Sequence, residues 1–281
     1  MDTALAWQIA LDRHAFSPGV IDGKIGPKTT LATREFQRCR RLPETGTLDQ
    51  ATAAALETHP EMAVARYAIH EADFARIGPA PPGWLAKSKL SMLGYESLEA
   101  AIAEKFHCSK ALLRSLNGGK DIAGMKAGDE IRVPGVVSWG PDRQGRRLQV
   151  NLSQKVIRVL GADGEVLALF HCSIAARKDK LPAGSARVAV IAENPTYTFD
   201  PAMWPEVKGV NRKLVIPPGP RNPVGLCWIG LSLPGYGMHG TPSPEMIGKT
   251  GSHGCFRLTN WDALRLSKMV QVGTPVEFAR Q

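Results

Sequence analysis

The sequence lacks the features that mark membrane-spanning, disordered and fibrous proteins. No stretch approaches the ~20 consecutive apolar residues of a membrane-spanning helix, and Met1-Asp2-Thr3 is not the basic start of a signal peptide. Hydrophobic residues make up 43% and charged residues 22% of the chain, which excludes extensive disorder and coiled coil. We therefore expect a soluble protein without an integral membrane segment, from which any export signal is absent or has been removed.

Charged residues show an excess of one sign but no long block of it. The chain has 35 Lys and Arg residues against 26 Asp and Glu residues. Most of the excess lies from Arg146 to the end, where 17 basic residues stand against 9 acidic ones. Because no basic block, zinc-ligand spacing or basic helix with heptads occurs, we expect no nucleic-acid partner. Scattered solvated side chains explain the charge, and it also suits a carboxylate-rich polymer as substrate.

Cysteine is sparse, and four of the five cysteines lie in apolar stretches. None belongs to a Cys-x-x-Cys pair, and no His/Cys spacing suits zinc, so we expect neither a metal site nor a cofactor. Lone cysteines are most often small buried hydrophobic residues. We expect that role for Cys39, Cys108, Cys172 and Cys227.

The length of 281 residues predicts two or three modules, and the first spans residues 1–60. Its apolar spacing predicts three helices, the second over 29–40 and the third ending at Leu56. The order Asp22-Gly23, Gly26 to Thr29, Phe36-Gln37 and Thr45 to Asp49 resembles that of the small three-helix peptidoglycan-binding domain. The resemblance implies binding to the cell wall. The alternative is a three-helix scaffold that binds nothing.

The second module spans residues 66–134. A short strand near Tyr67, two helices over 95–106 and 109–117, and a strand over 128–134 are predicted in this order. The order resembles the β-α-α-β LysM domain, which implies binding of glycan chains that contain N-acetylglucosamine. A segment rich in Pro and Gly at 78–83 departs from the compact form of that domain.

The third module spans residues 146–281 and is predicted to be mostly β. Apolar residues alternate with polar ones over 148–152, 156–160, 166–170 and 187–191. A last helix is expected to begin at Thr259 or Asn260, because Thr259 and Asp262 have the spacing of a capping box.

One cysteine of this module, Cys255, lies among residues that can activate a thiol. It belongs to the run Gly251-Ser252-His253-Gly254-Cys255-Phe256-Arg257, and His239-Gly240 lies upstream. A thiol with its free pKa of ~8.5 is a poor nucleophile at neutral pH, and a nearby imidazole can activate it. Either His239 or His253 could serve. Gly254 leaves room for a substrate carbonyl, nearby amides could form an oxyanion hole, and Arg257 could hold a carboxylate.

The run resembles the signature of the L,D-transpeptidase catalytic (YkuD) domain, which is a His-Gly followed by Ser/Thr-His-Gly-Cys, a hydrophobic residue and Arg. The resemblance implies that Cys255 is the nucleophile and His239 its base. It also implies that the carbonyl of Gly240 orients the imidazole, while His253 and Gly254 shape the site. Expected substrate-binding residues are Arg257, Ser252, Tyr236 and Trp228, although the two aromatic residues fit a core role equally well. The other histidines, His14, His59, His70, His107 and His171, are expected to be structural or surface residues.

The family resemblance implies transfer of an acyl group through a thioester. The donor is then a peptidoglycan stem peptide, and the acceptor another stem or the amine of an outer-membrane lipoprotein, in the periplasm or cell wall. One alternative is an L,D-carboxypeptidase or endopeptidase that passes the thioester to water. A noncatalytic wall-binding protein conflicts with the intact Cys255 and His239. A papain-like peptidase would place its His far downstream of the Cys.

Overall fold

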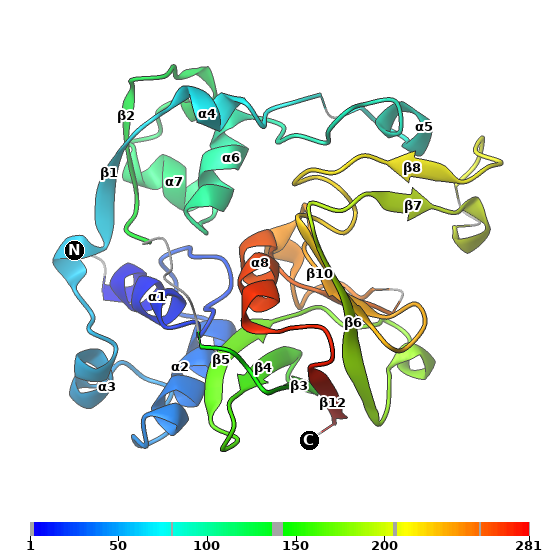
Figure 1. Cartoon of the computed structure of the whole chain (residues 1–281). Coiled ribbons are helices and arrows are strands. Elements are labelled where there is room, and N and C mark those ends of the chain that lie inside the picture. The colour runs from blue at the N-terminus through cyan, green and yellow to red at the C-terminus, as the bar shows by residue number, and fades with distance from the viewer. Residues whose placement is uncertain (1–2, 80, 137–142, 205–206, 253, 281) are drawn as a thin grey trace.

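The computed structural model describes residues 3–79, 81–136, 143–204, 207–252 and 254–280 (Figure 1). Three groups of elements follow one another along the chain: helices, a small mixed unit, and a large sheet with one helix against it. Short 3₁₀ helices lie in the connections between elements, at Pro60–Met62, Ile122–Gly124, Lys178–Lys180, Pro201–Met203 and Pro244–Met246.

The first group consists of α1 (Thr3–Arg13), α2 (Pro27–Cys39) and α3 (Gln50–Ala55), in agreement with the predicted three helices. A glutamine of α2 explains the spacing of the Phe-Gln and Thr-Gly pairs. The Gln37 amide donates to Thr45 Oγ1 at 2.9 Å and accepts from the backbone N–H of Gly46 at 2.8 Å. This side chain therefore supplies hydrogen bonds that the turn cannot make within itself.

The prediction that Cys39 is buried was wrong. Cys39 is the last residue of α2 and lies exposed, whereas Cys108, Cys172 and Cys227 are buried as expected. The apolar face of α2 packs through Ala32 and Phe36, and the helix ends before another turn brings that face around. All five cysteines are free thiols.

The second group is built around an antiparallel pair of strands, β1 (Val64–Ala68) and β2 (Glu130–Pro134). Two helices, α6 (Leu98–Lys105) and α7 (Lys110–Leu116), lie between these strands in the chain and share one core with them. The segment that joins β1 to α6 carries two short helices, α4 (Glu71–Phe74) and α5 (Trp84–Lys87). In Figure 1 this segment leaves the second group and runs to the far side of the molecule.

The third group contains an eight-stranded sheet in the order β11-β10-β9-β6-β12-β3-β4-β5. Its strands are β3 (Arg147–Asn151), β4 (Val156–Leu160), β5 (Val166–His171), β6 (Ser185–Glu193), β9 (Cys227–Leu231), β10 (Gly237–His239), β11 (Phe256–Arg257) and β12 (Pro275–Ala279). Two further strands, β7 (Tyr197–Phe199) and β8 (Leu214–Ile216), form a separate antiparallel pair.

The helix α8 (Asn260–Met269) packs against the sheet beside β9 and β10. The Thr259 side chain accepts from the backbone N–H of Asp262 at 3.1 Å, so the predicted cap is confirmed. Alternate residues of β4 belong to two cores, because Ile157 packs on the α8 side and Val156 on the α1–α2 side. The sheet is therefore covered on both faces near β4. In the described part of the chain, every helix is too short or too polar to cross a bilayer.

Candidate active site

Three neighbouring strands bring three of the predicted site residues into one row. In β10, His239 lies opposite Trp228 of β9 and opposite Arg257 of β11. Directly paired residues in a sheet project from the same face. The rings of Trp228 and His239 are accordingly stacked, with centroids 5.7 Å apart.

The hydrogen bond of His239 settles which of its nitrogens can accept a proton. Its Nδ1 lies 2.7 Å from the carbonyl oxygen of Gly240. Because a carbonyl can only accept, Nδ1 carries the hydrogen and Nε2 keeps its lone pair. Burial, with a smaller contribution from the charge of Arg257, lowers the pKa of His239 to about 4 despite this hydrogen bond. The ring is therefore neutral at pH 7.

Close packing holds the carbonyl of Gly240 in place. A Cβ atom on Gly240 would lie 2.1 Å from Oδ1 of Asn260, so no larger residue fits there. The same oxygen accepts from the backbone N–H of Leu226 at 3.0 Å, and the Asn260 amide donates to the carbonyl of Pro220 at 3.2 Å. Asn260 begins α8, so this helix supports the loop that orients His239.

Cys255 lies immediately before β11, two residues from Arg257, and lines the same cavity as His239. The thiol is half-buried, and Sγ lies 3.5 Å from the carbonyl oxygen of Gly235. Burial raises the pKa of Cys255, although the backbone of Gly237 and the charge of Arg257 act in the opposite direction. The free thiol and the neutral imidazole are thus the resting forms at neutral pH.

A single cavity of about 730 Å³ joins these groups. Among its lining residues are Cys255, His239, Arg257 and Trp228, so Trp228 contributes to the cavity wall. Tyr236 lies against the core instead, donates its hydroxyl hydrogen to the carbonyl of Lys180, and is not among the described residues that line the cavity.

The two small residues before the thiol shape its turn. The Ser252 hydroxyl donates to the carbonyl of Cys255 at 2.5 Å and accepts from the amide of Gly254 at 3.2 Å. Both residues line the cavity, but these hydrogen bonds occupy the Ser252 hydroxyl and turn the Gly254 amide toward the loop. His253, which was also predicted to shape the site, lies outside the described residues.

One wall of the cavity was not predicted from the sequence. It is formed by the β7–β8 pair and its connection, with Tyr197, Thr198, Met203 and Trp204 among the lining residues. Aromatic residues in a segment rich in Pro and Gly were the available signal. Their spacing does not predict that they share a cavity with Cys255, because that arrangement depends on how the separate strand pair folds over the sheet.

Comparison with known proteins decides the family. The profile of the L,D-transpeptidase catalytic domain matches residues 145–278, and that of a peptidoglycan binding domain matches residues 4–56. A Bacillus licheniformis protein named as the L,D-transpeptidase YkuD is 30% identical over 184 residues, covering 64% of this chain and 92% of its own. This chain belongs to the L,D-transpeptidase family. It is accordingly a cysteine-dependent enzyme that acts on peptidoglycan.

Other similar proteins bear the same name. The Escherichia coli protein named as the L,D-transpeptidase ErfK/SrfK is 30% identical over 168 residues, covering 59% of this chain and 54% of its own. Among solved structures, L,D-transpeptidase 3 from Mycobacterium tuberculosis with a faropenem-derived adduct is 17% identical. That comparison covers 55% of this chain and 75% of the other, with a TM-score of 0.37.

Proposed function

We propose that this L,D-transpeptidase uses Cys255 as nucleophile and His239 as general base to transfer an acyl group between peptidoglycan stem peptides. The observation that carries the assignment is the hydrogen bond from His239 Nδ1 to Gly240, which leaves Nε2 as a proton acceptor in the cavity that Cys255 also lines. A neutral acceptor and a protonated thiol in one cavity are the starting state for general-base catalysis.

The first half-reaction forms a thioester. His239 Nε2 takes the thiol proton while Sγ of Cys255 attacks the donor carbonyl. The C–N bond of the donor then breaks, and the imidazolium returns the proton to the leaving amine. Because Nδ1 stays bound to a rigid carbonyl, the ring keeps one orientation through both proton transfers.

The second half-reaction regenerates the enzyme. An acceptor amine attacks the thioester carbonyl and gives a proton to His239, the C–S bond breaks, and the thiolate recovers that proton. In the donor expected for this family, the broken amide follows the third residue of a stem tetrapeptide, and the acceptor is another stem or a lipoprotein amine. Arg257 lines the cavity and can hold a donor carboxylate, because its contact with the Gly251 carbonyl uses only one of its N–H groups.

The other parts of the chain fit delivery to the cell wall. We assign residues 1–60 to peptidoglycan binding, 66–134 to a LysM-like glycan-binding module and 146–281 to catalysis. The antiparallel pairing of β1 with β2 around α6 and α7 supports the second assignment. Tethered binding modules raise the local concentration of substrate. The proposal places the enzyme outside the cytoplasmic membrane, in the periplasm or wall.

Mass spectrometry tests the nucleophile and the reaction together. The protein and its Cys255→Ala variant are incubated with a carbapenem, a β-lactam class that forms adducts with the catalytic cysteine of this family. An adduct is expected on the protein and none on the variant. Incubation with purified muropeptides should then yield cross-linked products, whereas shortened stems without cross-links would favour hydrolysis. An adduct on Cys255→Ala would refute the assignment of the nucleophile.

A further inference from the structure

The segment that departs from the compact form of the second module leaves that module and returns to it at one point. Ile77 and Tyr95 form an isolated β-bridge, and the backbone N–H of Gly78 donates to the carbonyl of Tyr95 at 2.9 Å. The described residues between them, 78–79 and 81–94, therefore form an arm with a closed base (Figure 1).

The returning half of the arm is joined to the catalytic part by backbone hydrogen bonds. The N–H of Leu93 donates to the carbonyl of Pro218 at 2.8 Å, and the N–H of Arg221 donates to the carbonyl of Leu93 at 3.2 Å. Gly219 lies between these two contacts with φ +132°, and a Cβ atom there would lie 2.3 Å from the Leu93 oxygen. The close approach of the two backbones thus depends on a glycine.

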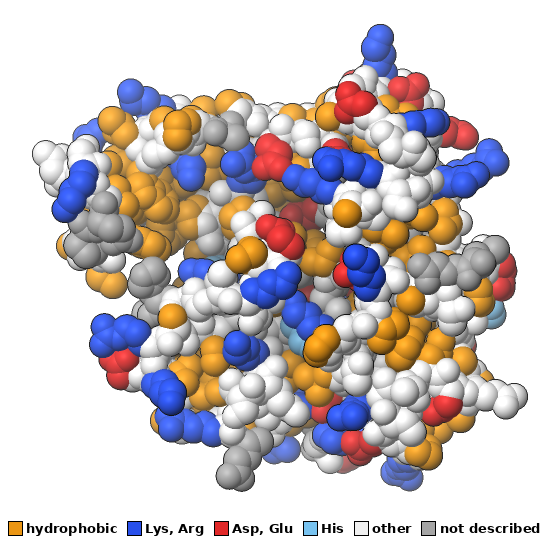
Figure 2. Space-filling view, turned by 180° about the vertical axis from the view of Figure 1, so that it is seen from behind, with side chains coloured by type: hydrophobic (Ala, Val, Ile, Leu, Met, Phe, Trp, Pro, Cys, Tyr) orange, Lys and Arg blue, Asp and Glu red, His pale blue; other side chains and the backbone are white. Residues whose placement is uncertain are grey.

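The tip of the arm carries Trp84, which packs on the β7–β8 pair. Its ring stacks on Phe199 with centroids 4.2 Å apart and an angle of 18° between the planes. The rings of Tyr197 and Trp204 lie 6.0 Å and 6.1 Å away. Figure 2 shows hydrophobic side chains gathered on the side of the molecule where α5 and this strand pair lie.

The β7–β8 pair depends on such a contact, because two strands alone are marginally stable in water. Among the described residues it forms no ladder with the eight-stranded sheet, and Val215 of β8 is exposed. Leu93 and Trp84 join Phe199, Leu214 and Ile216 in a separate small core. The arm therefore supplies the layer that the strand pair lacks.

The same strand pair forms a wall of the cavity that holds Cys255, through Tyr197, Met203 and Trp204. We propose that Trp84 is a positioning residue for the donor substrate: the arm of the second module braces the β7–β8 wall, and the brace sets how tightly the stem peptide is held. This inference rests on the proposed function, because it takes the Cys255 cavity as the donor site. Trp84 acts through Tyr197 and Trp204 and does not itself line the cavity.

The brace is tested with Trp84→Ala, Trp84→Phe and a matched control, Leu85→Ala, on the next residue of α5. Leu85 is 45% exposed and is not part of the small core of the strand pair. Trp84→Ala is expected to raise KM for a muropeptide donor about tenfold with kcat changed less than about threefold, because the wall is no longer pre-organised. Trp84→Phe should keep KM close to that of the unmodified protein, because the aromatic ring is retained. Leu85→Ala should have the same KM and kcat as the unmodified protein.

Two readouts separate positioning from general damage. Hydrogen exchange of the amides in β7 and β8 should accelerate at least about tenfold in Trp84→Ala, while amides of β9 stay protected. Alkylation of Cys255 by iodoacetamide should keep its rate, because the turn that holds the thiol is not touched. An unchanged KM, or unchanged exchange in β7 and β8, would overturn the proposal. Failure of the unmodified protein to process muropeptides would refute the proposed function instead, and the exchange experiment would still decide whether Trp84 braces the strand pair.

Discussion

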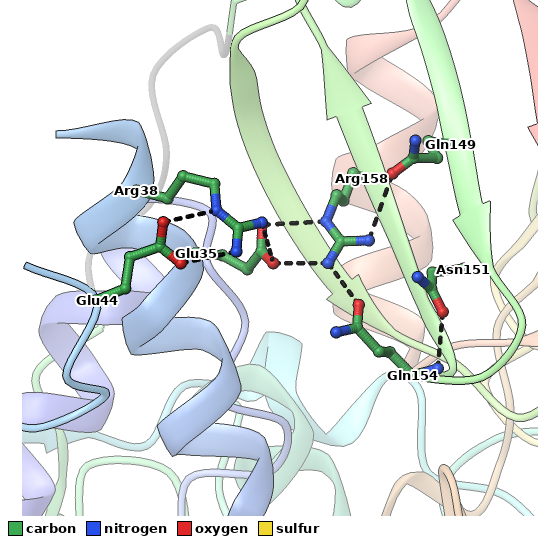
Figure 3. A network of polar contacts seen from close by, with 7 residues as sticks. All are labelled: Glu35, Arg38, Glu44, Gln149, Asn151, Gln154 and Arg158. Carbon is green, nitrogen blue, oxygen red and sulfur yellow. Dashed lines mark hydrogen bonds and ion pairs between the residues drawn. The ribbon is translucent and has the colours of Figure 1, made fainter. Parts of the chain in front are cut away.

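Glu35 of α2 and Arg158 of β4 form a buried ion pair that joins the first helices to the catalytic sheet (Figure 3). The guanidinium donates from Nη2 to Oε1 at 2.6 Å and from Nε to Oε2 at 3.0 Å. The Gln154 side chain accepts from the same guanidinium at 2.6 Å, and Arg38 contacts Glu35 from the other side. Both charges of the pair are thus enclosed and hydrogen-bonded.

Removal of one partner of this pair should destabilise the protein strongly. Glu35→Ala leaves the Arg158 charge buried without its counter-ion, which costs about 3–5 kcal/mol in the free energy of unfolding. Urea denaturation followed by circular dichroism measures this difference. The double variant Glu35→Ala, Arg158→Met removes both charges and should recover part of the loss. A single variant within about 1 kcal/mol of the unmodified protein would show that water screens the pair.

The pH dependence of Cys255 alkylation should show that the thiol is protonated at neutral pH. Because burial raises the pKa of Cys255 and lowers that of His239 to about 4, neither group is charged at neutral pH. The rate of alkylation by iodoacetamide should therefore climb about tenfold for each pH unit between pH 7 and pH 9. Loss of free Cys255 is followed by peptide mass mapping. A rate that is already level at pH 7 would instead indicate a preformed thiolate–imidazolium pair.

The close packing of Gly240, whose carbonyl orients His239, predicts that one added methyl group at Gly240 strongly reduces turnover. Gly240→Ala places a Cβ atom against Oδ1 of Asn260, so the carbonyl that orients the imidazole must shift. A misplacement of about 1 Å can reduce turnover about 100-fold. The control is Gly26→Ala, because a Cβ atom at Gly26 meets no other atom within 4 Å. Turnover of muropeptides and thermal unfolding are measured for both variants. Equal turnover in the two would contradict the claim that the packing of Gly240 orients His239.

The carboxyl group of Asp262 lies where the three groups of elements meet, and it predicts that the stability of the protein depends on pH. Burial, followed by the neighbouring charge of Asp12, raises the pKa of Asp262 to about 7. His107 and Lys28 also face this group, and the Ser17 hydroxyl donates to its Oδ2 at 2.8 Å. The folded protein therefore binds a proton that the unfolded chain releases near pH 4. Stability contributed by this group is present at low pH and is lost as pH rises toward 7.

The variant Asp262→Asn isolates this effect. Other buried groups oppose it, because burial lowers the pKa of His171 to about 3 and that of His239 to about 4, which favours folding as pH rises toward 6.5. These groups are common to both proteins, so the difference in urea midpoint between them reports Asp262 together with its coupling to His107. The urea midpoint of the variant should rise relative to that of the unmodified protein as pH increases from 4 to 8. A difference that stays constant over this range would contradict the prediction.

Local sequence determined the elements and the order of the chemical groups. Pro27 begins α2, Thr259 caps α8, and Gln37 with its Thr-Gly partner defines a turn, because each depends on hydrogen bonds or φ angles within a few residues. The run around Cys255 is local in the same sense, since Ser252 and Gly254 bond to the turn that carries the thiol.

Tertiary structure alone decided what covers each face. The alternation of apolar and polar residues in β4 predicts that one face of the strand is exposed to solvent. Arg158 is nevertheless only 5% exposed, because α2 covers it and Glu35 pairs with its charge. Cys39 sits in an apolar stretch but lies exposed at the helix end. The arm brings Trp84 against Tyr197 of the cavity wall, although the two residues lie more than one hundred positions apart in the chain. Such contacts follow from how separate modules dock, and periodicity within one segment carries no information about the partner surface.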